Sequence, residues 1–260
     1  MQQVRPKKAL GQHFLTDLDV ARRIAATLDD FQGLPVVEVG PGMGVLTQFL
    51  LEKHPGLTVV EIDTESVAWL NGNMPSLKGR ILEQDFLNLD LGELFHGEKM
   101  CVIGNYPYNI SSQIFFHVLE WKDLVACCSG MLQKEVAERL AAKPGTKARG
   151  ILSVLLQAWY DVEYLFTVNE NVFNPPPKVK SGVVRLVRNS VTELGCDPAA
   201  FKNVVKTTFG QRRKTIRNSI RSILPPGVQM PDTPLTAMRP EQLSVDQFIE
   251  LTNKIFPATR

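Results

Sequence analysis

The sequence is short of cysteine, of long apolar runs and of net charge, and each shortage excludes a class of protein. Its 260 residues include four cysteines. None of them forms a C-x-x-C pair or has a histidine partner, so a metal site is not expected. No apolar stretch is long enough to span a bilayer, and no charged-then-apolar leader is present, so we expect a cytoplasmic protein. The net charge of +2 alone does not indicate a nucleic-acid partner.

Composition is otherwise that of an ordinary globular protein. Hydrophobic residues make up 44% of the chain and charged residues 22%, enough for one large domain and a smaller one. Cys101, Cys127 and Cys128 lie in apolar runs, which predicts buried free thiols. Since no long exposed apolar seam is visible, we expect a monomer.

Strands and helices are predicted to alternate as far as about residue 157, the pattern of an α/β fold with a parallel sheet. An amphipathic helix is predicted over Asp17–Leu28. Predicted strands are 36–39, 57–60, 80–84, 100–104 and 124–132, followed by an antiparallel pair at 159–168 and 182–187. After about Asn189 the periodicity is helical. We therefore expect domains at residues 1–188 and 189–260, the second small and all-α.

A glycine-rich loop, Gly40-Pro41-Gly42-Met43-Gly44, follows the first predicted strand. Glycines are needed where backbone turns tightly and approaches a ligand closely. Val45 stands where the dinucleotide fingerprint G-x-G-x-x-G has its third glycine, which argues against a pyrophosphate cofactor. Glu38, just before the strand ends, suits a cofactor with a positively charged amino-acid end.

Acidic or amide side chains follow the next predicted strands. Glu61 lies 21 residues after Gly40, the spacing at which an acid reaches a ribose diol. Asp85 ends the following strand and could accept from an adenine amine, and Asn105 ends the one after. Taken singly, each acid could instead face solvent or cap a helix. Together these side chains are predicted to converge on one crevice, because ligands of open α/β sheets bind beyond the carboxyl ends of the strands.

The tetrapeptide Asn105-Tyr106-Pro107-Tyr108 carries the most specific signal in the chain. An Asn side-chain oxygen and a nearby backbone carbonyl can accept the two N–H hydrogens of an exocyclic amine while an aromatic ring stacks on the base. Methylation of adenine N6 requires this arrangement. The same tetrapeptide also occurs in ordinary turns.

These motifs closely resemble those of the S-adenosylmethionine-dependent rRNA adenine N6,N6-dimethyltransferases, and within that family the bacterial small-subunit enzymes. Two further blocks carry the resemblance, Lys8–Leu15 near the N-terminus and Val172–Ser181. Several motifs in the right order make the resemblance specific over the whole chain. The family more often has Asn where this chain has His13, and Leu or Ile where it has Tyr106.

The resemblance implies a Rossmann-like methyltransferase fold with a mixed seven-stranded sheet, S-adenosyl-L-methionine as cofactor and no metal. It also implies dimethylation of two adjacent adenosines in a 3′-terminal hairpin of small-subunit (16S) rRNA, with a role in subunit biogenesis. The predicted catalytic residues are Asn105, Tyr108 and Phe173, of which Phe173 could instead be a core aromatic. The predicted cofactor residues are His13, Leu15, Gly40, Glu61, Asp85 and Asn105.

A basic segment marks the predicted second domain. Between Asp197 and Asp232 there is no acidic residue. On a single helix, Phe209, Ile216, Ile220 and Ile223 would form a buried stripe beside a basic ridge. The predicted RNA-binding residues are Arg212, Arg213, Lys214, Arg217 and Arg221. A solvated helix face is the plainer interpretation of such a run of charges.

Other functions remain open from the residues alone. A large-subunit rRNA methyltransferase of the antibiotic-resistance type would use the same tetrapeptide. A DNA adenine methyltransferase usually has Asp where this chain has Asn105, and Val45 disfavours a nicotinamide dehydrogenase. A non-catalytic ribosome-assembly or RNA-binding factor could keep the same fold. Small-subunit rRNA or an immature small subunit is the expected partner.

Overall fold

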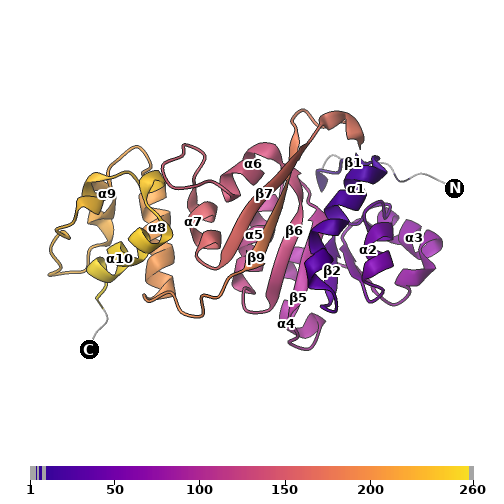
Figure 1. Cartoon of the computed structure of the whole chain (residues 1–260), viewed down its shortest axis with the longest axis horizontal. Helices are drawn as coiled ribbons and strands as arrows, with labels where there is room; N and C mark the ends of the chain where they lie inside the picture. The colour runs from indigo at the N-terminus through magenta and orange to yellow at the C-terminus, as the bar shows by residue number, and fades with distance from the viewer. Residues whose placement is uncertain (1–3, 5, 8–9, 258–260) are drawn as a thin grey trace. The chain divides into compact units, whose positions relative to one another are not determined.

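The computed structural model describes Val4, Pro6, Lys7 and residues 10–257 (Figure 1). The chain divides into two compact units. The first contains the residues up to Glu138 together with Val162–Arg188, and the second contains Arg139–Asp161 together with the residues from Asn189 onward. The second unit therefore includes a segment that lies well before residue 189 in the sequence.

A seven-stranded mixed sheet is the framework of the fold, and it confirms the predicted fold class. Its strands are β2 (Val36–Val39), β3 (Thr58–Glu61), β4 (Ile81–Glu83), β5 (Met100–Asn105), β6 (Val125–Gln133), β7 (Tyr160–Val168) and β9 (Ser181–Arg188). Their order is β4-β3-β2-β5-β6-β9-β7. The five strands from β4 to β6 are parallel to their neighbours, whereas β9 is antiparallel to β6. The direction of the order changes between β2 and β5.

The structure also contains a two-stranded sheet that was not predicted from the sequence. β1 (Phe14–Leu15) pairs antiparallel with β8 (Phe173–Asn174), so that Leu15 lies opposite Phe173. Next to this pairing, the backbone N–H of Thr16 donates to the carbonyl of Val172 at 2.8 Å. The opening motif and the late motif are thus neighbours in space.

Helices of the first unit complete its core. They are α1 (Leu18–Ala25), α2 (Thr47–Lys53), α3 (Thr64–Asn73), α4 (Leu91–Leu94) and α5 (Ser111–Glu120), with 3₁₀ turns η2 (Ala26–Phe31), η3 (Pro75–Leu77), η4 (Phe86–Asn88) and η5 (Glu170–Val172). Asp17 caps α1 by accepting from the N–H groups of Asp19 and Val20. One apolar cluster joins Ile24 and Leu28 to Leu50 and to strand residues such as Val59.

The second unit contains helices and no strand between residue 189 and residue 257, as predicted. Its elements are α7 (Ile151–Gln157), α8 (Pro198–Gly210), α9 (Ile216–Ser219), α10 (Val245–Ile255) and the 3₁₀ turns η6 (Ile220–Ile223), η7 (Pro234–Ala237) and η8 (Pro240–Gln242). α6 (Lys134–Leu140) runs from the first unit into the second. Phe209 of α8 stacks on Phe248 of α10 with ring centroids 6.1 Å apart.

The basic segment is not the single helix that its periodicity suggested. α8 ends at Gly210, a turn follows, and α9 begins at Ile216. At the start of α9, the N–H of Ile216 has no partner within its own helix and donates instead to the carbonyl of Met238 at 2.8 Å. Ile216 and Ile220 are nevertheless fully buried, as the stripe predicted. In the described part of the chain, no helix is both long and apolar enough to cross a membrane.

The side chain of Tyr106 is part of the core below the predicted site. Its hydroxyl donates to the carbonyl of Ser129 at 2.7 Å, and its ring meets Phe115 edge-on with centroids 5.6 Å apart. Two glycines of neighbouring strands make room for the ring: a Cβ on Gly104 would lie 3.0 Å from it and a Cβ on Gly130 would lie 2.6 Å from it. The large residue of the tetrapeptide therefore requires glycine at both positions.

We predict that Gly130→Ala destabilises the protein by about 1–3 kcal/mol, the usual cost of overpacking a core. The new Cβ would lie only 2.2 Å from the carbonyl oxygen of Gly104, which belongs to a strand and cannot move aside. Urea unfolding measures the effect. Gly72→Ala is the matched control, since nothing lies within 4 Å of its added Cβ and alanine is favoured in a helix. Equal midpoints for the two variants would contradict this account of the packing.

Candidate functional site

A pocket of the first unit opens where the strand order changes direction. Val39 pairs with Gly104 at this point, so the chain segments after β2 and at the end of β5 lie side by side. Open α/β sheets bind ligands at such a switch point. The pocket has a cavity volume of about 190 Å³ and is lined by residues from the opening motif, the glycine loop, the ends of β3 and β4 and the tetrapeptide.

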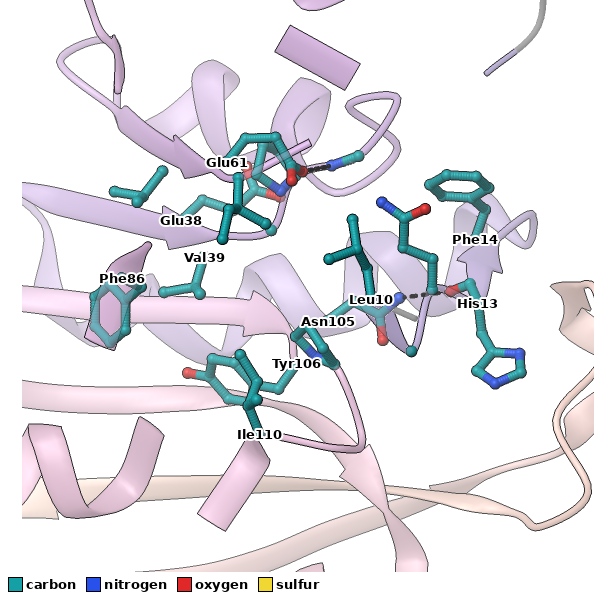
Figure 2. A pocket seen from close by; sticks show the side chains of 18 of the residues that line it. Leu10, His13, Phe14, Glu38, Val39, Glu61, Phe86, Asn105, Tyr106 and Ile110 are labelled. Carbon is teal, nitrogen blue, oxygen red and sulfur yellow. Dashed lines mark hydrogen bonds between the residues drawn. The ribbon is translucent and has the colours of Figure 1, made fainter. Parts of the chain in front are cut away.

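The glycine loop is fastened to the end of β3 by Glu61. Its carboxylate accepts from the backbone N–H of Gly42 at 3.1 Å (Figure 2). It also accepts from the backbone N–H of Asp63 at 2.9 Å. Burial raises the pKa of Glu61, against these two hydrogen bonds. Gly42 has a positive φ of 55°, and a Cβ there would lie 2.9 Å from the ring of Phe14. The opening motif thus packs directly on the loop.

Glu38 presents a buried carboxyl group to the same pocket. It is only 1% exposed, and burial raises its pKa to about 8. Its Oε2 atom has no hydrogen-bond partner among the described residues. A buried oxygen without a partner is costly, so a ligand that donates a hydrogen bond here is favoured.

The opening segment is held over the pocket by Asp63. Lys7 Nζ lies 2.5 Å from one of its carboxylate oxygens, and Gln12 Nε2 donates to the other at 3.2 Å. The Asp63 side chain is 1% exposed. Burial opposes its charge, but hydrogen bonds from Lys7, Gln12 and Ser66 outweigh burial and lower its pKa. The sequence suggested Lys7 for the basic field and placed Gln12 in the opening motif, but neither was predicted to contact Asp63, because nothing in their spacing points to an acid more than 50 residues away.

The tetrapeptide is oriented by the opening segment. Asn105 Nδ2 donates to the backbone carbonyl of His13 at 3.1 Å (Figure 2). Its Oδ1 receives no hydrogen bond from the described residues and is left for a ligand. Tyr108 is half-buried, and its hydroxyl lies 2.5 Å from Ser181 Oγ.

The structure brings most of the predicted site residues together. The pocket is lined by all of the predicted cofactor residues and by Tyr108: His13, Leu15, Gly40, Glu61, Asp85, Asn105 and Tyr108. Asp85 also caps η4, accepting from the N–H of Leu87 at 3.0 Å. Asp85 can therefore cap a helical turn and still face a ligand, which were the two roles predicted from the sequence. Phe173 is different, since it is 4% exposed, belongs to the apolar core and does not line the pocket.

The predicted RNA-binding residues differ in their surroundings within the second unit. Arg213 and Lys214 are exposed in the turn after α8, and Arg217 and Arg221 are exposed on α9 and η6. Arg212 is half-buried, donates to the carbonyl of Lys147 and lies 3.9 Å from Glu241. The guanidinium group of Arg212 is therefore partly engaged by Glu241 and Lys147 of the same unit. No group of three potential metal ligands occurs among the described residues.

A pocket at the switch point of a seven-stranded mixed sheet, with an Asn-x-Pro-Tyr loop at its edge, is the arrangement expected of a methyltransferase. Comparisons with known proteins give the family. The sequence profile of the family described as "Ribosomal RNA adenine dimethylase" matches residues 3–256. The chain is a member of this ribosomal RNA adenine dimethylase family, as its motifs predicted.

Curated relatives agree over the full length. "Ribosomal RNA small subunit methyltransferase A" of Parabacteroides distasonis is 68% identical over 254 residues, which are 97% of this chain and 94% of the relative. The protein of that name from Bacteroides fragilis is 62% identical over 260 residues, 100% of this chain and 96% of the relative.

Solved structures share the fold. A dimethyladenosine transferase from Plasmodium falciparum superposes with a TM-score of 0.77 at 23% identity, covering 92% of this chain and 96% of that one. The 23S rRNA methyltransferase ErmE superposes with a TM-score of 0.68 at 25% identity, covering 93% of this chain and 99% of that one.

We predict that Asp63→Asn loosens the opening segment while keeping the cap of α3. Amide hydrogen exchange in residues 12–15 should accelerate by about tenfold, the loss expected for a charged hydrogen bond. Glu65→Gln is the control, because Glu65 also contacts Lys7, at 3.1 Å, but is 58% exposed.

The same contact should weaken with acid. The folded-state pKa of Asp63 is below its ordinary value of 3.8, so its contribution is complete above that value and is lost as pH falls through the lower folded value. Wild-type protection factors (the intrinsic exchange rate at each pH divided by the observed rate) that do not fall below pH 3.8 would contradict the assignment. So would equal exchange rates in Asp63→Asn and Glu65→Gln at one pH.

Proposed function

We propose that this protein transfers methyl groups from S-adenosyl-L-methionine to N6 of two adjacent adenosines in a 3′-terminal hairpin of small-subunit (16S) rRNA. The product is N6,N6-dimethyladenosine, and the reaction serves small-subunit biogenesis in the cytoplasm. One observation carries the proposal: Asn105 lines the pocket with its donor atom bound to His13 and its acceptor atom without a hydrogen bond from the described residues. The names of the curated relatives support the small subunit as the source of the RNA.

The pocket residues fit S-adenosyl-L-methionine. Glu61 can accept from a ribose diol with the lone pairs that Gly42 and Asp63 leave unused. Asp85 lies where an adenine amine could donate to it, and the buried Oε2 of Glu38 offers an acceptor to the amino-acid end. When bound, this cofactor supplies an electrophilic methyl group on a sulfonium.

The tetrapeptide supplies the acceptors for the target base. We assign the Oδ1 atom of Asn105 to one N6–H of the adenine. The carbonyl of Pro107 already accepts from the N–H of Ile110 at 3.2 Å, so we assign the other N6–H to the carbonyl of Tyr106. These two hydrogen bonds draw the lone pair of N6 out of the ring plane and align it for attack. The N6 proton is released once the nitrogen has become positively charged, so no carboxylate base is required.

Tyr108 is the proposed stacking surface for the extruded base. A stacking role for Phe173 stays a prediction from the resemblance, and its burial in the core opposes it. The arrangement positions groups and excludes water without moving a proton through a side chain of the enzyme.

We predict that Asn105→Ala lowers the rate of methyl transfer by about 10²–10³-fold, as loss of an oriented polar group in an active site does. Affinity for the cofactor, measured by calorimetry, should remain within a few fold. The assay is mass spectrometry of nucleosides from unmethylated small subunits incubated with protein and S-adenosyl-L-methionine. Normal transfer by the variant would remove the basis of the proposal.

The same assay separates the competing functions. Dimethyladenosine formed on naked large-subunit RNA but not on small subunits would favour the antibiotic-resistance type of enzyme. Binding to small subunits without any methylated adenine would favour an assembly factor.

A second prediction concerns the basic residues of the second unit. Replacing Arg213, Lys214 and Arg221 together by alanine should weaken binding to small subunits and reduce the slope of log Kd against log salt by roughly two to three. Lys254→Ala is the control, since Lys254 is also a surface lysine but pairs with Glu250 on α10 at 3.7 Å. An unchanged salt slope in the triple variant would show that these side chains are a solvated surface only.

A further inference from the structure

The ring of Tyr108 is held by two contacts that come from opposite ends of the first unit's sequence. Its hydroxyl lies 2.5 Å from Ser181 Oγ. Its ring lies beside the imidazole of His13, with centroids 5.3 Å apart and the planes tilted by 33°. A half-buried tyrosine with both its tip and its face engaged has little rotational freedom.

Ser181 is rigidly placed. It is fully buried and is the first residue of β9, where it pairs with Gln133 of β6. The adjoining backbone is fixed as well, because the N–H of Lys134 donates to the carbonyl of Lys180 at 2.9 Å. The partner of the Tyr108 hydroxyl is thus a strand residue of the central sheet, not a loop residue.

His13 directs its side chain to the same place. Its Nδ1 lies 2.9 Å from the carbonyl oxygen of Pro175, and its own carbonyl accepts from Asn105. Figure 2 shows the imidazole on the side of the segment that faces away from Glu38 and Glu61. His13 thus lines the pocket, as expected of a cofactor residue, and also contacts Asn105 and Tyr108 of the tetrapeptide.

We propose that Ser181 and His13 are positioning residues that fix the Tyr108 ring as a preformed stacking surface for the target adenine. The inference rests on the proposed function and deepens it. Ser181 acts through the tyrosine hydroxyl, and His13 acts through the face of the ring and through Pro175. A surface that is ordered before the base arrives loses less entropy on binding, which favours the aligned complex.

Both methyl transfers need the base to stack in the same place, but the second has only one N–H left to hold it. Stacking therefore carries a larger share of the alignment after the first transfer. Loosening the Tyr108 ring should impair the second transfer more than the first. The monomethyl product should then accumulate.

The test is a double-mutant cycle with Ser181→Ala and Tyr108→Phe, assayed on unmethylated small subunits. Each single variant should lower kcat by about 5- to 10-fold, the loss of one hydrogen bond expressed in the rate. The double variant should be no slower than either single variant, because both remove the same bond. The ratio of monomethyl to dimethyl adenosine should rise in all three.

A matched control guards against a general loss of packing. Thr252→Val removes an equally buried hydroxyl, one that donates to the carbonyl of Phe248 within α10 at 2.7 Å. It should leave kcat and the product ratio unchanged. If Ser181→Ala lowers the unfolding midpoint more than this control does, Tyr108→Phe still removes the bond from the other side.

The outcomes are distinct. The role of Ser181 would be overturned if Tyr108→Phe kept the kcat of the wild type. It would also be overturned if the fold-loss in kcat of the double variant equalled the product of the two single losses. Absence of any methylated adenosine with the wild-type protein would instead overturn the proposed function itself.

The role of His13 has its own measurement. His13→Ala should leave the Kd for S-adenosyl-L-methionine, measured by calorimetry on the full chain, within about twofold while kcat falls about 5- to 10-fold, in line with losing one positioning contact. A tenfold or larger rise in that Kd with unchanged kcat would show that His13 acts in cofactor binding, and would overturn this part of the inference.

Discussion

The hydrogen bond from the Asn105 amide to the carbonyl of His13 is the constraint on which the site depends. An amide group has one donor side and one acceptor side, so engaging the donor determines where the acceptor points. The bond also requires the opening segment to lie across the end of β5. That position is maintained by Asp63 through Lys7 and Gln12. Cofactor pocket and base site are therefore formed by the same few contacts.

Much of this arrangement could be predicted from the sequence. The β-branched and apolar runs gave the strands to within one or two residues, because buried parallel strands need continuous hydrophobic character. Side chains at the ends of these strands meet by topology alone, so Gly40, Glu61, Asp85 and Asn105 could be expected in one pocket, and they line it together. Such residues need no knowledge of side-chain packing.

What could not be predicted depends on contacts between distant segments. Two-residue strands such as β1 and β8 have no periodicity to detect. The position of Tyr106 in the core depends on the absence of side chains at Gly104 and Gly130, which lie on separate strands. The start of α9 is held by a hydrogen bond from Ile216 to Met238, which lies more than 20 residues further along the chain. Local patterns carry no information on any of these partners.

The pairing of β1 with β8 also bears on how the protein is made. Phe14 lies opposite Asn174, so the strand that carries two of the pocket-lining residues pairs with a segment most of the first unit away in the sequence. Contacts between such distant residues close late, because the entropy of the intervening chain must be overcome first. A nascent chain can form β2 to β6 well before residue 174 emerges. The residues that line the pocket can therefore fold first, and Ser181, which holds the hydroxyl of Tyr108, joins them only later in synthesis.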